Sequence, residues 1–86
     1  MIFMGLGAGG LRRKEVVYRH RMDRAPTTED RDARIGYEGF VEMLQEEGWV
    51  SSDGDTTLKN FRWSYGSCTE PGNNYIEWKA VEILMH

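Results

Sequence analysis

Two side chains of this 86-residue chain could act in acid–base or nucleophilic chemistry at neutral pH, those of His20 and Cys68. An imidazole titrates near neutrality and can accept a proton, whereas a thiol becomes a good nucleophile only when a neighbouring base lowers its pKa. The second histidine is the terminal His86, and no histidine, cysteine or carboxylate set has metal-ligand spacing. We therefore expect no catalytic, cofactor-binding or metal-binding residues. A small nuclease-like enzyme that uses His20 or Cys68 is an alternative.

Two glycine-containing motifs could bind a phosphate or a cation. Gly5-Leu6-Gly7-Ala8-Gly9-Gly10 fits the pattern G-x-G-x-x-G, which binds a dinucleotide when it joins a strand to a helix. Here the following residues alternate like a strand, so residues 1–11 are interpreted as a Gly-rich N-terminal arm. Asp53-Gly54-Asp55 resembles part of a calcium loop, but the glycine and the downstream glutamate of that pattern are misplaced. This segment therefore predicts a turn.

Charge is divided unequally along the chain, although the net charge is only −3. From residue 12 to residue 24 six basic residues stand against two acidic ones, and from residue 29 to residue 55 nine acidic residues stand against two basic ones. The candidate protein-binding residues are acidic: Glu38, Glu42, Glu46, Glu47, Asp53 and Asp55. The candidate nucleic-acid-binding residues are basic: Arg12, Arg13, Lys14, Arg19 and Arg21. Each set could steer a partner of opposite charge, or the two could neutralise each other within the fold.

An aromatic stripe offers a further possibility. Phe61, Trp63 and Tyr65 alternate along one segment, and Lys59 and Arg62 accompany them. Such a strand can stack single-stranded bases while basic residues contact the phosphates. The competing interpretation, which we favour, is that this face packs into the core, because a small domain needs its large aromatic side chains there.

Size and composition indicate one domain, residues 12–86. Apolar residues make up 40% of the chain and ten residues are aromatic, which is sufficient for a core. No apolar run reaches the roughly 18 residues of a membrane span, and no basic segment precedes the apolar N-terminus as in a signal peptide. A single cysteine excludes an internal disulfide. We expect a cytoplasmic protein without a membrane partner.

The N-terminal half predicts a strand and a helix. Residues 14–22 alternate with a period of two, which is typical of a strand. Pro26 ends it, and Thr27 or Thr28 is expected to cap a helix whose apolar stripe has helical spacing. That stripe consists of Ala33, Tyr37, Phe40, Val41 and Leu44. Gly36 and Gly39 interrupt it, so either the stable helix begins near Gly36 or the glycines admit a close neighbour.

The C-terminal half predicts strands. Gly48 is expected to end the helix in a left-handed conformation, with Trp49 packing back on Leu44. Asp53-Gly54 suits a two-residue hairpin turn. It would join a short strand that includes Trp49-Val50-Ser51 to a strand over residues 57–65. A polar connection over residues 66–74 follows. The last strand, residues 75–84, has Ile76, Trp78 and Ala80 on one face and a bulge near Ala80.

Together these elements predict an α+β fold in the order β-α-β-β-β: a four-stranded, mainly antiparallel sheet with one principal helix on one face. The expected core consists of Phe40, Leu44, Trp49, Phe61, Trp63, Ile76 and Trp78. The function we expect is that of a small, non-enzymatic protein-binding module, an inhibitor or adaptor of the kind that phages direct against host enzymes. Its acidic helix face would bind a basic or nucleic-acid-processing partner. The alternative to this function is an RNA-binding or single-strand-binding module that uses residues 12–24.

Overall fold

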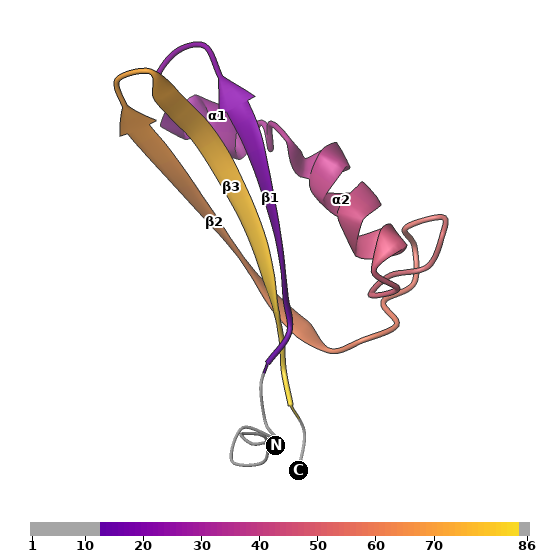
Figure 1. The fold of residues 1–86 in the computed structure, drawn as a ribbon. Helices are drawn as coiled ribbons and strands as arrows, with labels where there is room; N and C mark the ends of the chain where they lie inside the picture. The colour runs from indigo at the N-terminus through magenta and orange to yellow at the C-terminus, as the bar shows by residue number, and fades with distance from the viewer. Residues whose placement is uncertain (1–12, 85–86) are drawn as a thin grey trace, which may run out of the picture.

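The structure of the protein is a computed structural model that describes residues 13–84. The N-terminal arm predicted over residues 1–11 lies outside this range. The elements are β1 (Glu15–Met22), α1 (Thr28–Asp32), α2 (Tyr37–Glu46), β2 (Phe61–Glu70) and β3 (Asn73–Glu82). Figure 1 shows the strands as one long, twisted sheet, with α2 beside β1. The fold is therefore a small α+β domain, as predicted, with two short helices packed against the sheet. None of the helices within residues 13–84 is long and apolar enough to cross a membrane.

The sheet has three strands rather than the four predicted. Their order is β1-β3-β2, and both neighbouring pairs are antiparallel. The expected fourth strand is absent from the described sheet because residues 49–60 contribute only one isolated bridge, Val50 to Thr57. Between these two residues the Ser51 N–H donates to the Thr56 carbonyl at 2.7 Å, and the Gly54 N–H donates to the Ser51 carbonyl at 2.8 Å. The Asp53-Gly54 turn thus closes a compact loop and not a long hairpin.

The true hairpin joins β2 to β3, where a polar connection was predicted. Pairing continues from Phe61 opposite Glu82 to Glu70 opposite Asn73, and Pro71-Gly72 forms the turn. Gly72 has a φ of +77°, the conformation that the third position of a type II turn requires after proline. The prediction failed because the Gly, Ser and Thr residues of this segment have weak strand signals of their own. They are strands because β3 pairs with them. The bulge predicted near Ala80 is also wrong, since the register passes through Ala80 without a break on both sides.

The single predicted helix is divided in two. Thr27 caps α1, which ends after five residues, and Gly36 begins α2 with a φ of +86°. A Cβ at Gly36 would lie 2.8 Å from the His20 Cβ, and one at Gly39 would lie 2.3 Å from the Tyr18 ring. Both interpretations of these glycines are therefore confirmed: the longer helix begins beside Gly36, and each glycine lets β1 approach closely.

The C-terminal end of α2 is the one that the sequence predicts. Gly48 has a φ of +78°. The Trp49 N–H donates to the Leu44 carbonyl at 2.8 Å, and the Gly48 N–H donates to the Gln45 carbonyl at 3.0 Å. These two bonds define a Schellman motif, which satisfies carbonyl groups that the helix end would otherwise leave free.

The core lies between α2 and one face of the sheet, centred on Trp78. Its buried members are Val16, Phe40, Leu44, Trp49, Val50, Ile76, Trp78 and Ala80. Two predicted members differ: Phe61 is only partly buried, and Trp63 is 49% exposed. The reason is strand order, because β2 is an edge strand while α2 packs against β1 and β3.

The difference in burial between two aromatic residues can be tested. Phe40→Ala removes a side chain that is 1% exposed and should lower the free energy of unfolding by about 3–5 kcal/mol. Trp63→Ala should cost roughly half of that or less, because half of its surface already faces water. Chemical denaturation of both variants measures the difference. Equal losses would mean that Trp63 belongs to the core.

Two glycines with nearly the same backbone conformation should respond differently to asparagine. A Cβ at Gly48 would have no neighbour within 4 Å, so Gly48→Asn should be tolerated, because asparagine adopts positive φ readily. Gly36→Asn should be clearly destabilising, because its Cβ would meet that of His20. Gly48→Val should lower the free energy of unfolding by about 1–2 kcal/mol, because valine disfavours the left-handed backbone conformation at this position. Thermal melting compares the three variants, and equal melting temperatures for the two asparagine variants would contradict the predicted clash.

Candidate functional site

The exposed side of α2 and the loop after it carry the six predicted acidic residues, which we call the acidic surface: Glu38, Glu42, Glu46, Glu47, Asp53 and Asp55. All six are exposed. Glu38, Glu42 and Glu46 follow one another at intervals of four residues and so form a stripe along the helix. The two neighbouring pairs in this stripe repel each other by roughly 0.2–0.5 kcal/mol each. Only Glu38, in the first turn of α2, is favoured by the helix dipole, and the repulsion between neighbours is a cost to the fold.

The loop brings the two aspartates to the side of the same helix. The position of a Cβ on Gly54 lies 3.2 Å from the Gln45 side-chain nitrogen and 3.6 Å from Val41. Gln45 and Val41 occupy the flank of α2 between its buried face and the glutamate stripe. Asp53 and Asp55 adjoin Gly54 in the chain, so both loop carboxylates belong to a loop that lies against the flank of α2.

Within residues 13–84 no ion pair neutralises any member of the acidic surface. Asp53 alone has a local role, because its carboxylate accepts hydrogen bonds from the Ser51 hydroxyl and from the Asp55 N–H. These bonds hold the pKa of Asp53 below its usual value. Asp53 therefore remains ionised at neutral pH while it shapes the loop. No group of three or more His, Cys, Asp or Glu side chains in the described part of the chain could hold a metal ion.

The basic segment is less concentrated. Arg12 lies outside the described residues, and Arg13 and Lys14 precede β1. Arg19 and Arg21 lie on the sheet face opposite the helices. The Arg19 guanidinium donates to Glu77 at 2.8 Å and stacks 4.7 Å from the centre of the Tyr75 ring. Glu77 raises the pKa of Arg19, which stays charged but partly neutralised.

His20 and Cys68 do not form a catalytic pair. Their strands lie on either side of β3, with His20 opposite Ile76 and Cys68 opposite Tyr75. Ile76 is buried beneath the helices, and Tyr75 faces the other way, since successive residues of a strand alternate. The imidazole and the thiol therefore point to opposite faces of the sheet, and no proton can pass directly between them.

The aromatic stripe is not a flat platform for bases. Its three rings pack at angles against the two buried tryptophans: Phe61 lies 5.5 Å from Trp49, and Trp63 and Tyr65 lie 5.6 and 5.2 Å from Trp78. The Tyr65 hydroxyl is buried without a hydrogen-bond partner among the described residues, and burial raises its pKa. Trp63 also lines a cavity of about 280 Å³ with Arg13 and Arg62. Arg62 and Trp63 are consecutive residues of β2, so the guanidinium group of Arg62 and the Trp63 ring point to opposite faces of the sheet.

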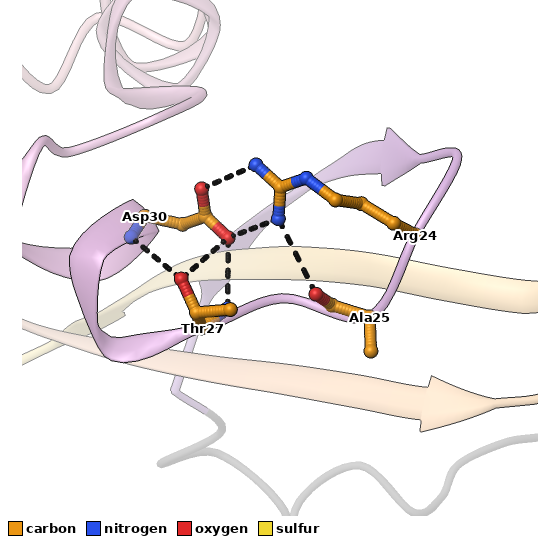
Figure 2. A network of polar contacts seen from close by, with 4 residues as sticks. All are labelled: Arg24, Ala25, Thr27 and Asp30. Atoms are coloured by element: carbon orange, nitrogen blue, oxygen red, sulfur yellow. Dashed lines mark hydrogen bonds and ion pairs between the residues drawn. The ribbon is translucent and has the colours of Figure 1, made fainter.

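A polar network that sequence reasoning did not single out joins the end of β1 to α1 (Figure 2). The Asp30 carboxylate, which is buried, accepts two hydrogen bonds from Arg24 at 2.7 and 2.8 Å. It also accepts the Thr27 N–H at 2.7 Å, while the Thr27 hydroxyl accepts the Asp30 N–H at 3.3 Å. The sequence does carry a signal for this network, because Thr27 and Asp30 have the Thr-x-x-Asp spacing of a capping box. The pKa of Asp30 lies far below its usual value, and the hydrogen bonds from Arg24 are the largest cause of this shift. Every partner of Asp30 is structural, so this network positions α1.

Comparisons of the chain with protein-family models, with curated proteins and with solved structures give no match.

The Asp30 network should make stability depend on acid pH. The pKa of Asp30 is depressed in the folded state, so the stability that its ionised form contributes is present above the unfolded value of about 3.9. It should be lost as pH falls below about 4. Denaturant midpoints from neutral pH down to about pH 2 should therefore fall more steeply for the wild-type chain than for Asp30→Asn. Arg24→Gln should also flatten the curve, because the guanidinium is the main cause of the shift. Parallel curves for the wild-type chain and Asp30→Asn would contradict this assignment.

Proposed function

We propose that this chain is a non-enzymatic protein-binding module whose acidic surface binds a basic surface on another protein. The observation that carries the proposal is the set of six exposed carboxylates on α2 and its loop, for which the described residues contain no ion-pair partner. The carboxylates that serve the fold are paired instead: Asp30 with Arg24, Glu77 with Arg19 and Glu82 with Lys59. Glutamates that repel one another along α2 and form no ion pair within the described residues suit a role toward a partner.

Electrostatics also defines the kind of partner. A contiguous acidic surface attracts a basic one over about 10 Å at moderate ionic strength, accelerates association and disfavours acidic partners. Proteins with basic surfaces include those that process nucleic acids. An acidic module bound there would compete with the nucleic acid, which is how an inhibitor or adaptor of the phage type would act. This last step is an analogy with small acidic proteins in general.

A second candidate function, single-strand or RNA binding, is favoured by one observation. Arg13 and Arg62 line one cavity with part of the half-exposed Trp63, and their guanidinium groups could contact phosphates there. Against it, Arg19 is paired with Glu77, and Lys79, on the same sheet face, is paired with Glu15. The basic charge available to a phosphate backbone is thereby reduced.

Charge reversal separates the two candidates. Glu42→Lys together with Glu46→Lys should leave the fold intact, because both side chains are exposed and off the core stripe. If the acidic surface binds, this variant should lose the proteins that the wild-type chain retains from nuclease-treated lysate. Association with a purified partner should slow by about tenfold or more at low salt and depend less on salt. Retention of lysate proteins is measured with the chain immobilised on a surface. Association with the purified partner is then measured at two salt concentrations.

The matched control changes the net charge equally at another place. Asp23→Lys together with Asp32→Lys alters two exposed carboxylates outside α2 and its loop and should retain the partner. Arg13→Glu, Arg19→Glu and Arg21→Glu combined should abolish binding only if the second candidate is correct, in which case Trp63→Ala should also weaken binding of a fluorescent single-stranded oligonucleotide. Partner binding that survives the glutamate reversal unchanged would refute the acidic-surface proposal.

A further inference from the structure

Strand β2 has a free edge in the described structure. The order β1-β3-β2 leaves one side of its ten residues unpaired, and Figure 1 shows this side facing away from α2. Glu70 and Asn73 flank a two-residue turn and are therefore a hydrogen-bonded pair, so the even-numbered residues of β2 direct their backbone groups to β3. The odd-numbered residues from 61 to 69 direct theirs to the free edge. Such an edge is a template for another strand.

The side chains of this edge suit a second copy of the same strand. Arg62 and Glu70 lie four residues before and four residues after Gly66, on the same face of the sheet. Neither has an ion-pair partner among residues 13–84, and their neighbours on β3 are the uncharged Val81 and Asn73. When two such strands run antiparallel about Gly66, each Arg62 lies opposite the Glu70 of the other copy.

We propose that two copies of this chain associate through the free edges of β2, antiparallel about a two-fold axis at Gly66. An axis at Tyr65 or Ser67 would place Arg62 opposite Cys68 or Gly72 of the other copy and not opposite Glu70. With the axis at Ser64 or Cys68, Arg62 of one copy would not lie opposite Glu70 of the other. The register at Gly66 keeps the helices of both copies on one side and forms two cross-strand ion pairs.

The resulting dimer is a six-stranded sheet in which the edge at β2 no longer exists. Trp63, which is 49% exposed in the single chain, would lie opposite Thr69 of the second copy and gain cover. The acidic surface lies on α2 and on the loop after it. The helix α2 packs against β1 and β3 and does not lie at the dimer edge. The two acidic surfaces would both remain available, so dimerisation is independent of the proposed function and would make it bivalent.

A disulfide tests both the association and its register. Across the axis the two Gly66 Cα atoms form a non-hydrogen-bonded pair about 4.5 Å apart, a distance that a disulfide can span. A Cβ at Gly66 meets no atom within 4 Å, so a cysteine there should not disturb the fold. We expect Gly66→Cys combined with Cys68→Ser to form a covalent dimer on mild oxidation. Ser64→Cys combined with Cys68→Ser should not, because the two thiols would be about 13 Å apart.

Charge exchange tests the ion pairs without oxidation. Arg62→Glu and Glu70→Arg should each raise the dimer dissociation constant on the order of tenfold, because each variant turns two attractions into two repulsions. The double variant restores opposite charges and should return to near the wild-type constant. Arg21→Glu, an exposed change on β1, serves as the control. Sedimentation velocity from low micromolar to near-millimolar protein gives the constants, and thermal melting verifies the fold of each variant.

The outcomes are decisive in both directions. Selective crosslinking at residue 66 together with rescue by the double charge exchange would establish this dimer. A monomer at every concentration, with no crosslink at residue 66, would overturn the proposal. Equal crosslinking at residues 64 and 66 would also overturn it, because random collision would then explain both.

Discussion

The indole of Trp78 is the interaction on which the rest of the fold depends. This residue lies on the central strand β3, is 1% exposed, and packs against the rings of Tyr37, Phe40, Trp63 and Tyr65. A buried indole N–H needs an acceptor, and it donates to the Ile35 carbonyl at 2.9 Å. Ile35 lies in the turn between α1 and α2. The bond therefore fixes the point where the helical segment breaks, and Gly36 supplies the conformation that lets α2 start there.

One consequence of this arrangement is that the two edges of the sheet differ. The close approaches at Gly36 and Gly39 draw α2 over β1 and the centre of the sheet. The edge at β2 is left with a half-covered tryptophan and a free row of backbone groups. A small domain has too few elements to cover all its strands, so one edge remains for solvent or for another chain.

The carboxylates fall into two groups by their surroundings. Asp30, Glu77 and Glu82 each contact a basic side chain and help to hold strands and helices together. The glutamates of α2 and the two loop aspartates form no ion pair among the described residues, although Arg34 precedes α2 and lines a pocket with Glu38 and Glu42. Apart from the Arg24–Asp30 pair, the strongly acidic and basic segments of the sequence form no ion pair with each other among residues 13–84. That lack of pairing within the described range is the physical basis for proposing an acidic binding surface.

The sequence by itself determined the features that depend on neighbouring residues. The alternation along β1, the stripe of α2, the glycine at its end and the buried face with Ile76, Trp78 and Ala80 all follow from local periodicity and backbone preference. The exposure of Glu38, Glu42 and Glu46 follows from the same helical spacing. Tertiary structure alone decided the features that depend on distant partners. These are the length of β2, whose polar residues become a strand because β3 pairs with them, and the exposure of Trp63, which follows from strand order. Tertiary structure also decided that His20 and Cys68 lie on opposite faces of the sheet and that Arg24 pairs with Asp30. Strand order and register are set by contacts between residues far apart in the chain, and local patterns carry no information about which of these contacts form.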